Sequence, residues 1–220
     1  MDEFTLFKLP KEINSIPDSA ERLFLLGLLS IVKNDLEEGC DLVEKALKIN
    51  PYNHEIWRGY LVALVNKKRY AKVLSVLESS VKFRHPTMLF ESFYRGVEWG
   101  CMHMAQESER LLKAMNIFDD IEKSYPNTMK IYQRIISLGS QTENLEVICR
   151  IISEVAEENE VEISHLRLEC REVISFIAMV ETTDADMICR MNFDVMMRIV
   201  KKQLGVNDLI GYFDACEKES

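Results

Sequence analysis

The feature that most constrains this chain is a pair of apolar helical patterns that recurs after 34 residues. Shifting the sequence by that interval places Leu36 on Tyr70 and Val43 on Leu77, positions that belong to the apolar stripe of a helix in both copies. A unit of this length has too few apolar residues to bury its own face, so neighbouring copies must stack against one another.

Each copy is expected to form a helical hairpin. Asp18 and Glu21 have the spacing of a capping box, which predicts a first helix from residue 19 to about residue 33. A second helix follows almost at once and ends before Pro51, and helices joined so tightly lie antiparallel. In the second copy Asn53 is placed to cap a helix to about residue 66, and residues 70–83 form its partner.

Small and aromatic residues give the two hairpins a resemblance to tetratricopeptide repeats. The matching residues are Gly27, Gly39, Ala46 and Pro51 in the first copy and Trp57, Tyr60 and Tyr70 in the second. Small residues allow helix backbones to approach closely, and aromatic residues fill the space opposite. The resemblance covers residues 19–86 and implies a right-handed solenoid of antiparallel helix pairs.

The remaining segments are expected to extend this helical stack. Residues 87–160 are interpreted as degenerate helical hairpins, with one long helix from Thr87 to about residue 104 and a further one ending at Pro126. Residues 161–220 are expected to form three capping helices, at about 162–180, 184–203 and 206–217, with Thr183 or Asp184 as the cap of the middle one. The predicted class is therefore all-α, with about ten or eleven helices in one continuous domain.

Residues 1–18 are expected to be an extended N-terminal arm. Phe4, Leu6, Phe7 and Leu9 bring apolar side chains close together in this segment, and Pro10 interrupts it. Such an arm needs an apolar surface on which to place these side chains.

Charge and cysteine content narrow the classes of function. The net charge of -9 and the pI near 5.1 disfavour nucleic acid and anionic membrane surfaces as partners. The six cysteines lack the CxxC spacing of zinc and redox sites. Neither a signal peptide nor a membrane-spanning segment is visible, so the cytoplasm is the expected location.

No catalytic, metal-binding or cofactor-binding motif stands out. The glycines are scattered rather than clustered into a phosphate-binding loop, and the histidines form no HExxH set. His165 and Glu169 could share one side of a helix, but a surface ion pair explains them equally well. The methionines around Met196 are interpreted mainly as core residues, although thioethers also suit adaptable binding surfaces.

The resemblance implies a concave groove lined by the first helix of each hairpin. The matching groove residues are Glu21, Phe24, Leu28, Ile31 and Val32 in the first copy, and Glu55, Arg58, Val62, Val65 and Asn66 in the second. Apolar residues form its floor, which favours an amphipathic helix or an apolar extended peptide of another protein as the ligand. The N-terminal arm, the C-terminal helices or a second copy of the chain are alternative occupants.

The leading hypothesis is a protein-interaction adaptor or scaffold that is not an enzyme. A dedicated chaperone for a hydrophobic secretion substrate is the nearest alternative, because small acidic tetratricopeptide chaperones have similar grooves. An enzyme with a site among the C-terminal helices, and a HAT-type helical repeat of an RNA-processing assembly, remain as more distant alternatives.

Overall fold

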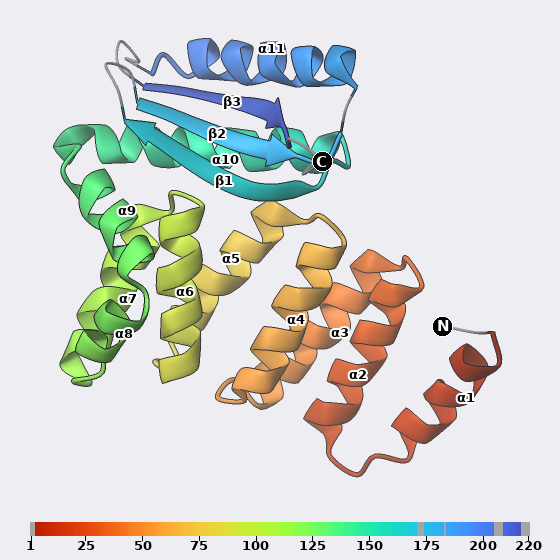
Figure 1. The fold of residues 1–220 in the computed structure, drawn as a ribbon. Coiled ribbons are helices and arrows are strands. Elements are labelled where there is room, and N and C mark those ends of the chain that lie inside the picture. Colours follow the sequence, from red (N-terminus) through yellow and green to blue (C-terminus); the bar gives the residue numbers. More distant parts are fainter. Residues whose placement is uncertain (1–2, 171–173, 183, 205–208, 217–220) are drawn as a thin grey trace.

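The helices of residues 19–114 lie in two layers, which Figure 1 shows one in front of the other. This computed structural model describes residues 3–170, 174–182, 184–204 and 209–216. The front layer holds α2, α4 and α6, and the back layer holds α3, α5 and α7. Their bounds are α2 (Ser19–Val32), α3 (Leu36–Ile49), α4 (His54–Asn66), α5 (Tyr70–Val81), α6 (Pro86–Glu98) and α7 (Met102–Ala114).

The expected helix starts of the two hairpins are present. The Asp18 carboxylate accepts a hydrogen bond from the Glu21 N–H at 2.8 Å, and the Asn53 side chain accepts one from the Glu55 N–H at 3.0 Å. These bonds satisfy backbone donors that have no partner within the first turn of a helix. The start of α5 at Tyr70 follows the start of α3 at Leu36 by the expected 34 residues.

Two breaks separate the next helices where the sequence predicts continuity. The long helix expected from Thr87 to residue 104 is wrong: α6 ends at Glu98, and Gly100 has a φ of +68° that a right-handed helix does not allow. His85, rather than Thr87, is the N-cap of α6. Asn116, with a φ of +59°, separates α7 from the short helix α8 (Phe118–Ser124), which precedes α9 (Pro126–Ile136).

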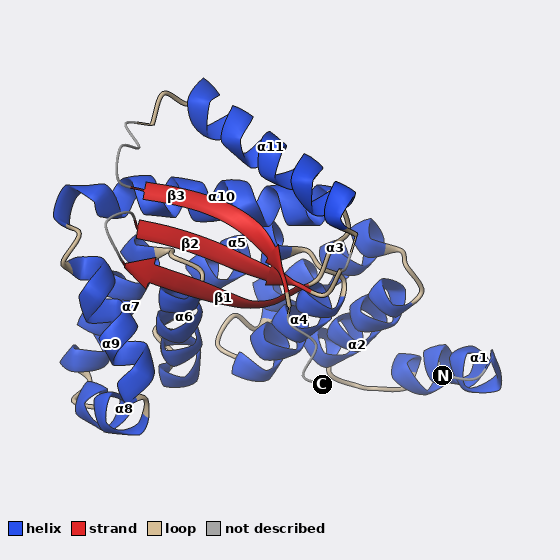
Figure 2. Cartoon of the chain, turned by 45° about the horizontal axis from the view of Figure 1, so that its top comes forward, coloured by secondary structure: helices blue, strands red, loops and turns tan. Residues whose placement is uncertain are grey.

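The last part of the chain is an α/β unit, so the all-α class is wrong there. After the 3-10 turn η1 (Gly139–Gln141) come α10 (Thr142–Glu158), β1 (Ile163–Cys170), β2 (Ile174–Val180), α11 (Ala185–Lys201) and β3 (Leu209–Ala215). The strand order is β1-β2-β3, with β1 antiparallel and β3 parallel to β2. Figure 2 shows α10 behind the sheet and α11 beyond β3.

Only one of the three expected capping helices forms. The predicted helix 184–203 corresponds to α11, and Asp184 is its N-cap, accepting from the Met187 N–H at 3.1 Å; Thr183 lies outside the described residues. The predicted helices 162–180 and 206–217 are wrong, because β1 and β2 occupy the first segment and β3 the second. Every described β2 side chain from Phe176 to Val180 is buried, as in a central strand, and such a continuous apolar run has no period that separates strand from helix.

Carboxylates of α10 attach this α/β unit to the helical layers. Glu157 accepts hydrogen bonds from the Ala71 N–H at the start of α5 and from Arg69, each at 3.3 Å. Glu146 accepts one from the His103 N–H at the start of α7, at 3.4 Å. Negative charge is favourable at the N-terminus of a helix, so α10 caps two helices of the back layer at once.

The N-terminal segment is helical, so the extended arm is wrong. Residues Glu3–Asn14 form α1, which contains Pro10 and packs beside α2. The side chains of Phe4, Leu6 and Phe7 lie outside what the structure describes, whereas Ile13 is buried. Pro10 removes one backbone donor but does not end this helix, which shows that a proline alone is a weak stop signal near a chain end.

Within the described residues, we find no helix that combines the length and the apolar character needed to cross a membrane.

Candidate functional site

The front layer of helices carries a row of three depressions, which together form the candidate binding surface. The first lies between α2 and α4 and has a volume of about 470 Å³. Its aliphatic residues include Val32 and Val62, with 50% and 60% of their surface exposed. Its lining residues are Leu28, Ile31, Val32, Glu55, Arg58, Gly59, Val62, Ala63, Asn66 and Lys67.

The second depression lies between α4 and α6 and has a volume of about 290 Å³. It shares Arg58, Val62 and Asn66 with the first, so these side chains of α4 form a ridge between the two. On α6 it is bordered by Glu91 and Arg95. Charges of both signs therefore surround an aliphatic floor, an arrangement that suits an amphipathic ligand.

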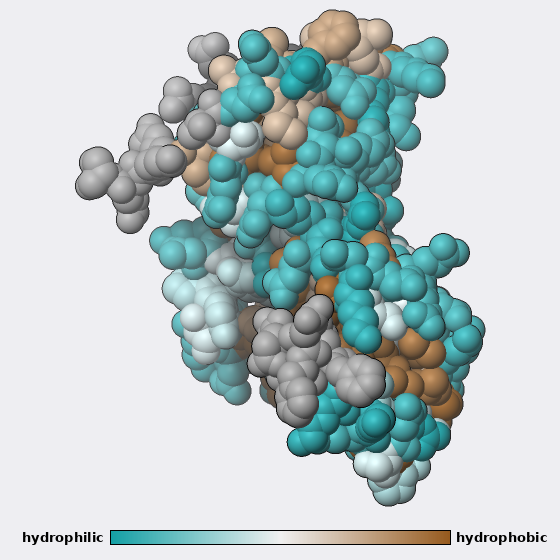
Figure 3. Space-filling view, turned by 90° about the vertical axis from the view of Figure 1, so that its right-hand side faces the viewer, coloured by the Kyte–Doolittle hydropathy of each residue, from teal (hydrophilic) through white to brown (hydrophobic). Residues whose placement is uncertain are grey.

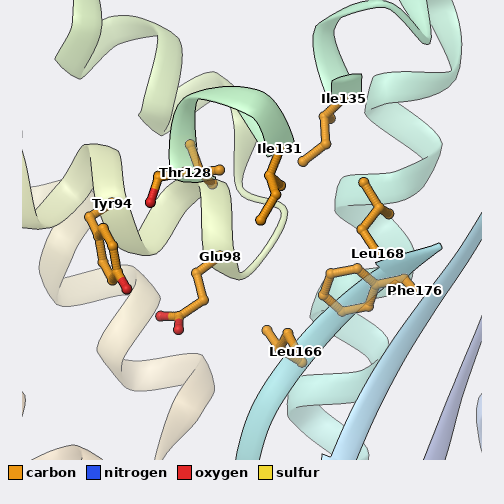
Figure 4. Close-up of a pocket in the computed structure, with 9 residues that line it drawn as sticks. Tyr94, Glu98, Thr128, Ile131, Ile135, Leu166, Leu168 and Phe176 are labelled. Atoms are coloured by element: carbon orange, nitrogen blue, oxygen red, sulfur yellow. The ribbon is translucent and has the colours of Figure 1, made fainter. Parts of the chain in front are cut away.

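The third depression is a smaller pocket of about 120 Å³ where α6, α9 and the sheet meet. Figure 4 shows Ile135, Leu168 and Phe176 at its apolar end, with Tyr94, Glu98 and Thr128 bringing oxygen atoms to its other end. Glu98 accepts a hydrogen bond from Arg95 at 2.6 Å, which links this pocket to the second depression along α6. Ligand pockets for small molecules usually enclose about 300–1,000 Å³, so this space fits one side chain better than a metabolite.

Most of the groove residues expected from the sequence lie on this surface. Eight of the ten line the first or the second depression; the exceptions are Glu21 and Phe24. The Phe24 ring instead packs against Gly59 of α4, and Glu21 is exposed in the first turn of α2. Ile31 lines the first depression but is only 1% exposed, because it packs against Gly39 at the crossing of α2 and α3.

The sequence did not point to the residues that continue the surface beyond α4. Glu91 and Arg95 follow Arg58 and Val62 by 33 residues rather than 34, and the one-residue change moves them off the predicted register. The contributions of Leu166 and Leu168 depend on β1 being a strand, which the sequence pattern did not reveal. Only the apolar spacing of α6 carried a usable signal.

Titratable groups elsewhere form structural contacts rather than a reaction centre. His103 contacts Glu146 of α10, and Arg150 donates a hydrogen bond to Glu78 of α5 at 2.7 Å. Burial raises the pKa of the nearby Cys101 thiol to about 12, so this cysteine is a poor nucleophile. Among the described residues, no three His, Cys, Asp or Glu side chains are placed to share a metal ion.

The other candidates from the sequence are dispersed. His165 and Glu169 lie on β1 rather than on a helix. Met191 is buried, as expected for a core residue, whereas Met196 and Met197 are exposed by 51% and 49%. Cys40, Cys101, Cys149, Cys189 and Cys216 are free thiols.

We found no family model, curated protein or solved structure with significant similarity to this chain. Its function is therefore inferred from its own residues and their geometry.

Proposed function

We propose that this chain is a protein-interaction module that holds an apolar or amphipathic segment of another protein against the front layer of helices. The observation that supports this best is the ridge of α4, where Val62 is 60% exposed between two adjoining depressions. Each Å² of apolar surface that a ligand removes from water there contributes about 25 cal/mol.

The arrangement of the depressions favours a chain segment over a compact molecule. They follow one another across α2, α4 and α6, in the row that Figure 1 shows in front, so a single segment can place successive side chains into them. Helices and extended peptides bind grooves in this way, with anchors at regular intervals. The small pocket between α6, α9 and the sheet offers such a segment an anchor point for one side chain with an apolar stem.

Charges on the rim are suited to selecting the partner. Glu55, Arg58, Glu91 and Arg95 border the aliphatic floor. A segment with complementary charges on either side of its apolar residues gains in association rate and in specificity more than in affinity.

The proposal includes the resemblance of residues 19–86 to tetratricopeptide repeats. It is supported by the two-layer arrangement of the hairpins and by the close approach of Gly27 to Gly39, two positions that the resemblance requires to be small. In that family the first helices of the hairpins line the groove, which agrees with the position of α2 and α4 in the surface described above.

The test is quantitative affinity purification from the native source with the wild-type chain and two charge-matched variants. Val62→Asp places a carboxylate on the α4 ridge, whereas Ile49→Asp places one at the end of α3, where Ile49 is 54% exposed outside the three depressions. We expect one set of partner proteins to be recovered with the wild type and with Ile49→Asp but depleted at least about tenfold with Val62→Asp.

Circular dichroism of all three proteins checks that the fold is retained. Equal recovery of every partner with Val62→Asp and with the wild type would refute the assignment of the binding surface.

A further inference from the structure

Helix α11 has two apolar sides, of which only one faces the protein. Met191, Val195 and Ile199 are buried in the core at 1%, 0% and 6% exposure. Phe193, Met196, Met197 and Val200 occupy the opposite side and are exposed by 60%, 51%, 49% and 65%. The spacing of these four residues places them in one stripe along the helix.

This outer stripe is too concentrated to be ordinary surface variation. Single exposed apolar residues are common, but four large ones on one helix face form a contiguous patch of the kind found at interaction sites. Figure 3 shows apolar side chains in pale brown gathered at the top of the molecule, the level at which Figure 1 places α11.

The charges along α11 indicate which occupant fits this face. Asp186 lies in the first turn and Lys201 is the last residue of the helix, and both are exposed. Arg198, in contrast, is already bonded to Glu158 and Asp194 of its own chain. The outer face is therefore acidic at one end, apolar in the middle and basic at the other end.

We propose that the outer face of α11 is the interface of a homodimer, in which α11 of a second copy packs antiparallel to it about a twofold axis. Such an axis brings the same patch of both copies together, so the patch must be complementary to itself. Antiparallel packing satisfies this, because Asp186 of each copy then lies beside Lys201 of the other and the two helix dipoles oppose each other. By the same symmetry Phe193 packs on Met196 of the second copy.

The size of this interface sets its strength. Helix α11 has 17 residues and is about 25 Å long. One face of a helix of that length covers less than the roughly 800 Å² per partner of a standard interface, so the dimer forms in the micromolar range. This interface is separate from the surface on α2, α4 and α6, and the inference does not depend on the proposed function.

Sedimentation of the purified full chain at about 1 to 200 μM tests the inference. The wild type is expected to shift from the mass of a 25.6 kDa monomer towards twice that value as the concentration rises. Phe193→Asp is expected to weaken the association at least about tenfold. Tyr52→Asp, at a residue that is 70% exposed in the loop before α4, is the matched control and should dimerise like the wild type.

Charge exchange tests the antiparallel arrangement. Asp186→Lys and Lys201→Glu should each weaken the dimer, and the double variant should recover the wild-type association. A wild type that stays monomeric over the whole range, or a Phe193→Asp variant that dimerises as well as the wild type, would overturn the inference. So would a monomer that binds vesicles of anionic lipid through this face, because the face would then be a membrane-contact surface.

Discussion

Gly27 of α2 and Gly39 of α3 face each other at the point where the two helices cross. A Cβ atom added to Gly27 would lie 2.8 Å from the carbonyl oxygen of Gly39, and one added to Gly39 would lie 2.8 Å from the carbonyl oxygen of Gly27. Carbon atoms do not approach carbonyl oxygens so closely, so any larger residue forces these backbones apart. The closeness of the first hairpin therefore depends on two missing methyl groups.

Gly27→Ala is expected to lower the free energy of unfolding by about 1–3 kcal/mol through overpacking. Replacing glycine by alanine inside a helix normally stabilises it by up to about 1 kcal/mol, so the sign of the result separates the two effects. Urea denaturation followed by circular dichroism measures the change. The control Ser75→Ala, at an exposed position of α5, should remain within about 0.5 kcal/mol of the wild type. A Gly27→Ala protein at least as stable as the wild type would show that the crossing relaxes freely.

The same pair shows what the sequence makes predictable. Gly27 and Gly39 were expected at a close helix crossing because small residues recur there among otherwise large apolar ones, and the structure confirms that approach. The caps Asp18 and Asn53 were equally readable, since each satisfies backbone donors within three residues along the chain. Features determined by local contacts were therefore recovered.

The C-terminal unit was not predictable in this way, because distant segments decide its structure. Ile177 and Val180 belong to an apolar run that is buried as a strand only because β1 and β3 lie on either side of it. In β3 the alternating exposure of Leu209, Ile210 and Gly211 is clear in the structure, but the segment is too short to exclude a helix on pattern alone.

The candidate site divides along the same line. Its α2 and α4 residues follow from the repeat, which is encoded within single hairpins. Its α6 residues lie beyond a change of one residue in the repeat spacing, and its β1 residues depend on the sheet. Sequence reasoning located about half of the surface and missed the part that tertiary contacts create.

Asn192 protects the free edge of β3, and its replacement should be costly. Its side-chain amide donates to the Phe213 carbonyl oxygen at 3.0 Å and accepts from the Phe213 N–H at 2.7 Å, as a neighbouring strand would. Asn192→Leu leaves both backbone groups without these partners and is expected to lower the free energy of unfolding by about 1–3 kcal/mol.

Asn192→Asp is the matched variant that separates the two bonds. The carboxylate still accepts from the Phe213 N–H but has no proton to donate to the carbonyl oxygen, so its loss of stability should be the smaller one. Thermal denaturation of the three proteins gives the order. If Asn192→Leu matches the wild type in stability, the amide has no role in protecting the edge.

His85 makes the stability of the helical layers depend on pH. Its ring stacks on that of His54 with centroids 4.3 Å apart and planes inclined by 7°, and its buried Nδ1 has no hydrogen-bond partner among the described residues. Burial, together with the charge that His54 can carry, lowers the pKa of His85 below its ordinary value of 6.5. The unfolded chain therefore binds this proton more readily than the folded one, and the free energy of unfolding falls as the pH drops below about 6.5. Above that pH the residue is neutral in both states and contributes no slope.

His85→Gln removes the proton-binding group and should flatten the pH dependence of stability between about pH 7.5 and 5.5, even if it lowers stability at every pH through the lost stacking. Urea denaturation at three pH values and constant ionic strength measures the slope. His165→Gln, which removes an exposed histidine of β1 outside this pair, is the control. Carboxylates that titrate in the same range contribute equally to all of these proteins, so the difference in slope between His85→Gln and the wild type isolates His85. Identical slopes for the two would mean that the folded protein binds the His85 proton as easily as the unfolded chain does, and that the stacked pair does not act on the pH dependence of folding.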